Sequence, residues 1–171
     1  AQETIVAAQA VAQRLDSPVL DAEHILDALV EPDDGVPAET LRRLGVDLPA
    51  FRGELASTLS RRARIKGGSL ALDPRAKRVI ERAEDEARRL GDEYVSTEHL
   101  LLSLAGEPHL DAGASREQIA EAVAQVRGPE QRQHQVGSGR HTPQPERLPE
   151  ILVVPGKLGV GRRVEQSGEP K

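Results

Sequence analysis

Two acid–histidine pairs are the residues of this sequence that are best suited to chemistry. Glu23 precedes His24, and Glu98 precedes His99. A neutral imidazole can act as a general base or bind a metal ion, and a neighbouring carboxylate can orient it. A metal site needs three or four converging ligands, however, and neither pair has a second histidine one helical turn away. We therefore predict no catalytic residue and no metal site, and we interpret both pairs as helix starts, where the dipole favours a carboxylate.

A stand-alone hydrolase or metal enzyme that uses these pairs is the alternative from another class. The sequence contains no cysteine, and no serine stands in the strand-to-helix turn that a strained serine nucleophile requires. The phosphate-binding pattern G-x-x-x-x-G-K-S/T is also missing, because the glycines and the lysine of residues 156–162 stand in a different order. We expect neither ATP chemistry nor another cofactor in this chain.

A turn-like segment directly before the second pair holds one of the two aromatic residues of the chain. Tyr94 lies between Asp92 and Glu98 and belongs to no apolar stripe. A tyrosine in a loop can cover the ends of helices. It can also stand with the two acids at a surface that suits apolar and basic segments of a partner. Both interpretations remain open at this point.

The elements that must position these residues are predicted to be helices. Asp21 is expected to cap the helix of the first pair, and Asp73 with Pro74 opens the helix that precedes the second pair. The near absence of aromatic residues leaves Leu, Ile, Val and Ala to build the core, which favours an all-α fold. Apolar residues recur with helical spacing over residues 5–15, 25–29, 37–44, 48–59, 76–90 and 115–126.

The helical pattern occurs twice along the chain. Both residues of the first acid–histidine pair recur 75 positions later, and apolar positions recur in the same register. Ile5 matches Ile80, for example, and Leu26 matches Leu101. So many identities in one register predict the tandem duplication of one helical unit.

Differences between the copies define the expected domain boundaries. The first copy covers about residues 1–62 and the second about 73–128, so the folded domain is predicted to span 1–128. The stretch that holds a short proline-capped helix in the first copy is about eight residues shorter in the second. We expect the second copy to lack that helix and to be the weaker half. Residues 129–171 contain six prolines and six glycines, a composition typical of a disordered tail.

Charge and hydropathy exclude several classes of partner. The net charge of −5 gives no basic footprint for nucleic acid, and the apolar runs are too short to cross a membrane. The lack of cysteine fits a reducing compartment, so we expect a cytoplasmic protein. The basic run of residues 61–66, between the copies, is expected to be a solvated linker.

The two copies resemble the double Clp repeat at the N-terminus of the Clp/heat-shock unfoldases. Residues 22–26, Ala-Glu-His-Ile-Leu, carry the resemblance in the first copy. In the second copy the resemblance rests on residues 91–101, Gly-Asp-Glu-Tyr-Val-Ser-Thr-Glu-His-Leu-Leu. This segment resembles the ClpB disaggregase branch most. The resemblance covers residues 1–128 and implies tandem four-helix Clp repeats. It also implies a non-catalytic domain that recognises unfolded or aggregated polypeptide, or an adaptor protein, for a Clp ATPase ring in cis or in trans.

The resemblance assigns a role to three residues. Asp92 and Glu98 match acids that are implicated in substrate handling at the groove between the repeats, and Tyr94 is expected beside them. The alternative is a stand-alone acidic interaction module, or a degenerate paralogue whose second repeat has decayed.

Overall fold

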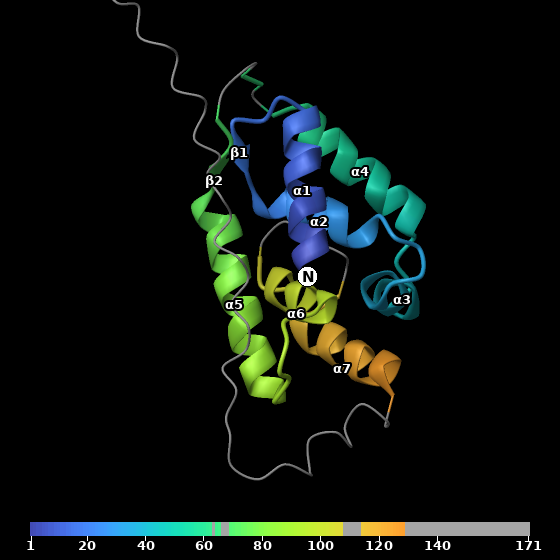
Figure 1. Ribbon diagram of the computed structural model, residues 1–171. Helices are drawn as coiled ribbons and strands as arrows, with labels where there is room; N and C mark the ends of the chain where they lie inside the picture. Colours follow the sequence, from blue (N-terminus) through green and yellow to red (C-terminus); the bar gives the residue numbers. More distant parts are fainter. Residues whose placement is uncertain (63, 66–68, 108–113, 129–171) are drawn as a thin grey trace, which may run out of the picture.

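A computed structural model describes residues 1–62, 64–65, 69–107 and 114–128 of the chain. The proposed tail, residues 129–171, lies outside this part. The described residues form helices with one very short strand pair, which confirms the all-α class (Figure 1). The elements are α1 (Gln2–Arg14), β1 (Val19–Leu20), α2 (Ala22–Val30), α3 (Val36–Arg43), α4 (Leu48–Ser60), β2 (Ala71–Leu72), α5 (Pro74–Leu90), α6 (Thr97–Leu104) and α7 (Arg116–Arg127).

Local signals set the ends of these helices as the sequence predicted. The Asp73 carboxylate accepts a hydrogen bond from the backbone N–H of Arg75 at 2.8 Å, and Pro74 opens α5. Gly91 ends α5 with a φ of 73°, a left-handed conformation that favours glycine. This reversal turns the chain sharply at Asp92, directly before α6.

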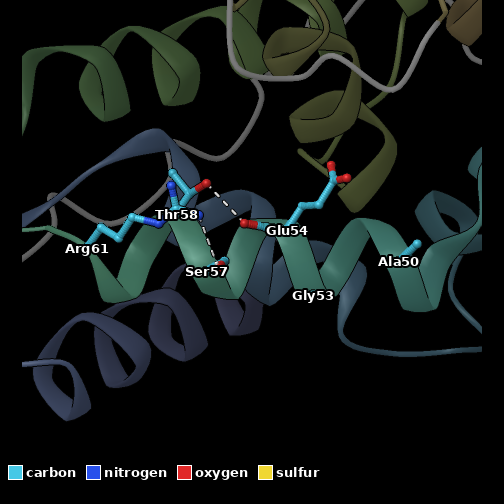
Figure 2. Close-up of a pocket in the computed structure, with 6 residues that line it drawn as sticks. All are labelled: Ala50, Gly53, Glu54, Ser57, Thr58 and Arg61. Atoms are coloured by element: carbon cyan, nitrogen blue, oxygen red, sulfur yellow. Dashed lines mark hydrogen bonds between the residues drawn. The ribbon is translucent and has the colours of Figure 1, made fainter.

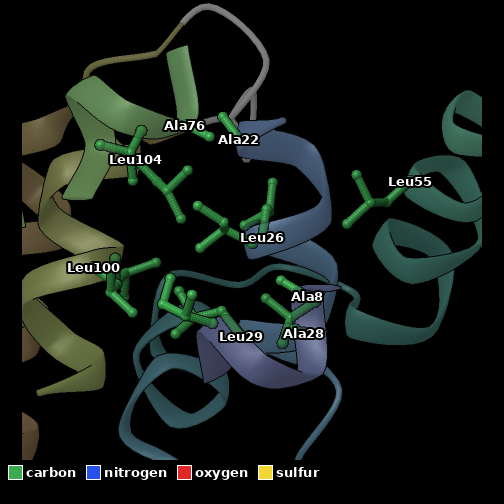
Figure 3. Packing of buried hydrophobic residues seen from close by; sticks show 14 of the residues in the cluster. Ala8, Ala22, Leu26, Ala28, Leu29, Leu55, Ala76, Leu100 and Leu104 are labelled. Carbon is green, nitrogen blue, oxygen red and sulfur yellow. The ribbon is translucent and has the colours of Figure 1, made fainter. Parts of the chain in front are cut away.

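The two central helices of the fold are α2 and α6, one from each copy. Nearly every residue of both is buried, because α1 packs on α2, α5 packs on α6, and α2 and α6 pack on each other. Figure 3 shows Leu26 and Leu29 of α2 in the same apolar cluster as Leu100 and Leu104 of α6. One shared core therefore joins the two copies.

A short parallel strand pair links the segments that lead into α2 and α5. Val19 pairs with Ala71, and Leu20 pairs with Leu72. This pairing could not be predicted from the sequence, since two residues are too few to show an alternating pattern. This strand pair attaches residues 71–72, which lie between the two copies, to the first copy.

The helix α3 crosses from the first copy to the second, where it packs against α7 and α6. Residues 108–113, where the second copy would hold its own short helix, lie outside the described residues, and α6 is buried along its length. The expectation that the second copy is the weaker half stays a prediction. Helix α4 buries Leu48, Leu55 and Leu59 and exposes most of its other residues.

None of the described helices combines the length and the apolar character that crossing a membrane requires. The longest, α5, carries charged residues along most of its surface.

Thr40 of α3 provides a test of this cross-repeat packing. Its side chain is 0% exposed, and its hydroxyl finds no hydrogen-bond partner among the described residues. A buried hydroxyl without a partner costs stability, so Thr40→Val should raise the free energy of unfolding by about 1 kcal/mol in urea denaturation. Thr58→Val is the control, because Thr58 is exposed on α4 and should change the stability little. A loss of stability in Thr40→Val would contradict the described packing of α3.

Candidate functional site

Each acid–histidine pair lies at the start of a central helix, and its histidine forms a capping box with the N-cap residue, Asp21 or Ser96. The backbone N–H of Asp21 donates to His24 Nδ1 at 3.1 Å, and that of Ser96 donates to His99 Nδ1 at 2.9 Å. An Nδ1 atom that accepts a hydrogen bond carries no proton, so both histidines are held as Nε2–H tautomers when neutral. The interpretation of the pairs as helix starts is confirmed.

The carboxylate next to each histidine is buried and must be compensated by a positive charge. Glu23 is 2% exposed. Arg62, which follows α4, pairs with both Glu23 and Asp21, and Arg75 at the start of α5 approaches them at 3.9 and 3.5 Å. The expectation that Arg62 is part of a solvated linker is therefore wrong. Two buried carboxylates attract it, because a charge in a low-dielectric interior needs a partner.

The second copy repeats this arrangement with an arginine from the end of α7. Arg127 Nη2 lies 2.7 Å from Asp92 Oδ2, and Arg127 Nε lies 3.6 Å from Glu98 Oε1. His99 Nε2 donates to the same Asp92 oxygen at 2.8 Å. The hydrogen bond to Asp92, which outweighs burial, raises the pKa of Arg127. The guanidinium is thus a fixed positive charge between the turn and the start of α6.

The structure therefore brings two of the three predicted site residues together and leaves the third apart from them. Asp92 and Glu98 share Arg127, and both are largely shielded from solvent. Tyr94 is 59% exposed on the turn between α5 and α6. The site is a rigid turn with an exposed aromatic ring and a neutralised acid pair at its base.

Arg127 is the residue of this site that sequence reasoning missed. A signal for it exists, because Arg62 and Arg127 each follow or end the last helix of their copy. The offset of 75 residues conceals this correspondence, since the shorter second copy shifts Arg127 out of register with Arg62.

Helix α6, which this turn precedes, packs on α2 and α3 of the first copy. The turn of the second copy therefore leads directly into the contact between the copies.

A shallow hollow lies on α4. Figure 2 shows its lining, which comes entirely from one face of α4. The polar groups there bond within the helix, as when the Thr58 hydroxyl donates to the Glu54 carbonyl at 3.0 Å. In the part of the chain that the structure describes, no group of His, Asp or Glu side chains is arranged to hold a metal ion. The hollow supplies no converging groups for chemistry.

Comparison with known proteins identifies the architecture. A family model described as the Clp repeat (R) N-terminal domain matches residues 1–135. The chain belongs to this family. The resemblance inferred from the two helix starts is thereby confirmed, and proteins of the ClpA, ClpB and ClpC types all match the chain.

Two curated relatives illustrate the extent of the similarity. The negative regulator of genetic competence ClpC/MecB of Bacillus subtilis is 40% identical over 107 residues, which cover 63% of this chain and 13% of that protein. The chaperone protein ClpB of Nitratidesulfovibrio vulgaris is 34% identical over 140 residues, which cover 74% of this chain and 16% of that protein. The chain thus spans only about a sixth of the length of the curated relatives it matches.

Solved structures share the fold at lower sequence identity. The N-terminal domain of Hsp104 from Candida albicans superposes with a TM-score of 0.65 and 20% identity, covering 73% of this chain and 87% of that one. The N-terminal domain of the ClpV1 ATPase from E. coli gives a TM-score of 0.62 and 22% identity, with 88% of each chain covered. The likeness confirms the Clp-repeat fold of the described helices.

The capping role of His24 predicts a pH dependence of stability. Burial, followed by the charge of Arg62, lowers the pKa of His24 in the folded protein. A lowered pKa stabilises the fold above the unfolded value of about 6.5, and this stability is lost as the pH falls below it. His24→Gln should remove that loss, because Gln118 already fills the same capping position in α7.

The measurement is the difference in the free energy of unfolding between the wild type and His24→Gln from pH 7 to pH 5. This difference cancels the titration of all other groups. We expect the wild type to lose stability relative to the variant as the pH falls. Parallel pH profiles would contradict a neutral capping histidine.

Asp92 is predicted to support the fold as well as the site. Asp92→Ala removes the acceptor of both His99 Nε2 and Arg127, so the free energy of unfolding should fall by about 2 kcal/mol in urea denaturation. Asp85→Ala is a matched control, because Asp85 forms an exposed ion pair on α5 and should cost less than about 0.5 kcal/mol. Equal losses in the two variants would contradict the network around Asp92.

Proposed function

We propose that this domain is a non-catalytic recognition module of a Clp chaperone or unfoldase system, which binds unfolded polypeptide at the turn between α5 and α6. The observation that carries the proposal is the exposure of Tyr94, 59%, on a turn whose acids are held in place by Arg127. An exposed aromatic ring contributes a large contact area, and ordering it on binding restricts only two side-chain torsions. Membership in the Clp repeat family supports a role in substrate recognition.

The position of the turn supports this choice over the hollow on α4. The turn leads into α6, which packs on α2 and α3 of the first copy, so a segment bound at the turn lies close to both copies. The hollow is lined by short or charged side chains of a single helix. It offers no aromatic or aliphatic anchor of the kind that dominates binding energy.

The charge around the turn supports a preference for unfolded segments that combine apolar and basic residues. The chain has a net charge of −5, and Glu93 is exposed next to Tyr94, in addition to the paired acids Asp92 and Glu98. Cationic side chains are attracted to such a surface, while the tyrosine ring receives the apolar ones. Acidic segments are repelled from it.

The proposal extends to the partners named by the relatives. Proteins called ATP-dependent Clp protease ATP-binding subunit and chaperone protein ClpB are longer than this chain and contain a matching region. We propose that the domain delivers substrate or an adaptor protein to a Clp ATPase ring, in cis or in trans, in the cytoplasm. The domain itself is proposed to span residues 1–128, with 129–171 as a separate tail.

Tyr94 is the residue that tests the recognition site. Tyr94→Ala should weaken binding of a labelled unstructured peptide of alternating leucine and arginine by about tenfold, because truncation of an aromatic anchor costs more than about 1 kcal/mol. Fluorescence anisotropy measures the affinity, and thermal melts confirm that the variant is folded. Glu98→Gln should weaken the binding of the same peptide. It should leave unchanged the binding of an analogue in which citrulline replaces arginine.

Ile65→Ala is the matched control, because Ile65 is another exposed apolar side chain, 55% exposed, at the joint between the copies. It should bind as the wild type does. If Tyr94→Ala binds as tightly as Ile65→Ala, the recognition site lies elsewhere and the assignment of Asp92, Tyr94 and Glu98 is wrong.

A further inference from the structure

Arg127 stands where the proposed recognition site meets the end of the folded domain. It is the last residue of α7, and Gly128 follows it with a left-handed φ of 68°. Its guanidinium contacts Asp92 of the turn and Glu98 of α6. One side chain therefore connects the proposed site with the point at which the chain leaves the last helix.

The first copy shows what a fully compensated acid pair looks like. Arg62 and Arg75 together face Asp21 and Glu23, one arginine from each copy. In the second copy the guanidinium of Arg127 lies between both acids, with Nη2 2.7 Å from Asp92 Oδ2 and Nε 3.6 Å from Glu98 Oε1. The longer contact with Glu98 is not a hydrogen bond. Of the two acids, Glu98 is therefore the one that a cation of the partner can approach with the smaller loss of contacts to Arg127.

We propose that Arg127 determines the specificity of the recognition site, as the internal counter-ion that a cationic side chain of the bound polypeptide displaces from Asp92 and Glu98. The proposal rests on the proposed function, since it requires polypeptide to bind at this turn. Arg127 acts as a positioning residue. Its charge opposes a second cation, and it holds the acids neutralised until one arrives with the additional contacts of a bound segment.

Displacement has a consequence for the end of the domain. When the guanidinium of Arg127 leaves Asp92, the last turn of α7 loses the side-chain contacts that join it to the turn before α6. Binding of a cationic segment is then linked to loosening of residues 123–127. The linkage is reciprocal, so holding the end of α7 in place weakens the binding of cationic segments.

The test compares two peptides on Arg127→Gln: the leucine–arginine peptide and its citrulline analogue, which has the same shape without the charge. We expect the affinity for the arginine peptide to rise about tenfold in the variant, within the usual range of coupling between sites. The affinity for the citrulline peptide should stay within about twofold of the wild-type value. Arg127→Lys, which keeps the charge, should resemble the wild type for both peptides.

Arg116→Gln is the matched control for the loss of one positive charge from α7. Arg116 begins the same helix and pairs with Glu86, away from the turn. It should raise the affinity for the arginine peptide by less than about twofold, since exposed charges beyond hydrogen-bonding range are screened. An unchanged affinity of Arg127→Gln for the arginine peptide, or an equal rise for both peptides, would overturn the proposal.

Hydrogen exchange on the wild-type protein keeps the proposal testable if Arg127→Gln does not fold. Saturation with the arginine peptide should speed exchange of the amides of residues 123–127, and the citrulline peptide should not. Unchanged or slower exchange with the arginine peptide would overturn the displacement of Arg127. The proposed function fails separately, and this proposal with it, if Tyr94→Ala leaves the binding of both peptides unaffected.

Discussion

A carboxylate is buried at the start of the central helix in each copy, and its charge has to be balanced inside the protein. Glu23 and Glu98 stand in the first turns of α2 and α6, where the helix dipole favours them. The dipole supplies only a partial charge, whereas a buried carboxylate needs a full counter-charge. The arginines that provide it come from the ends of other helices, so each buried acid fixes the arrangement of several elements.

The two copies meet this requirement with arginines from different helices. In the first copy Arg75 reaches the acids from the start of α5, so the compensation ties the two copies together. In the second copy Arg127 compensates the acids from the end of α7, and Tyr94 remains exposed above them. The first pair thus joins the two copies, while the second joins the end of α7 to the turn that we propose as the binding surface.

Local patterns allowed much of the fold to be predicted. The duplication, the helices and the capping residues Asp21, Asp73 and Ser115 all depend on neighbours within a few positions, and the structure confirms them. The ion pairs of Arg62 and Arg127 could not be predicted in the same way. They join residues that are distant in sequence, and the shorter second copy hides their equivalence.

The packing of the short helix required the structure as well. Counting residues predicted a second copy without a counterpart of α3, and residues 108–113, where such a helix would begin, lie outside the described part of the chain. The structure adds that α3 of the first copy packs on α7 and α6 of the second. A helix shared between repeats has a partner that periodicity within one repeat cannot reveal.

We propose that recognition occurs at one turn, and an NMR titration of the isotope-labelled protein with the leucine–arginine peptide tests this most directly. Backbone amide shifts report which residues meet the peptide without any substitution. We predict that the largest shifts fall on residues 92–98, with a second group at 123–127 and little change along α4. Shifts that cluster on Ala50, Gly53 and Ser57 of α4, with residues 92–98 unchanged, would contradict the account.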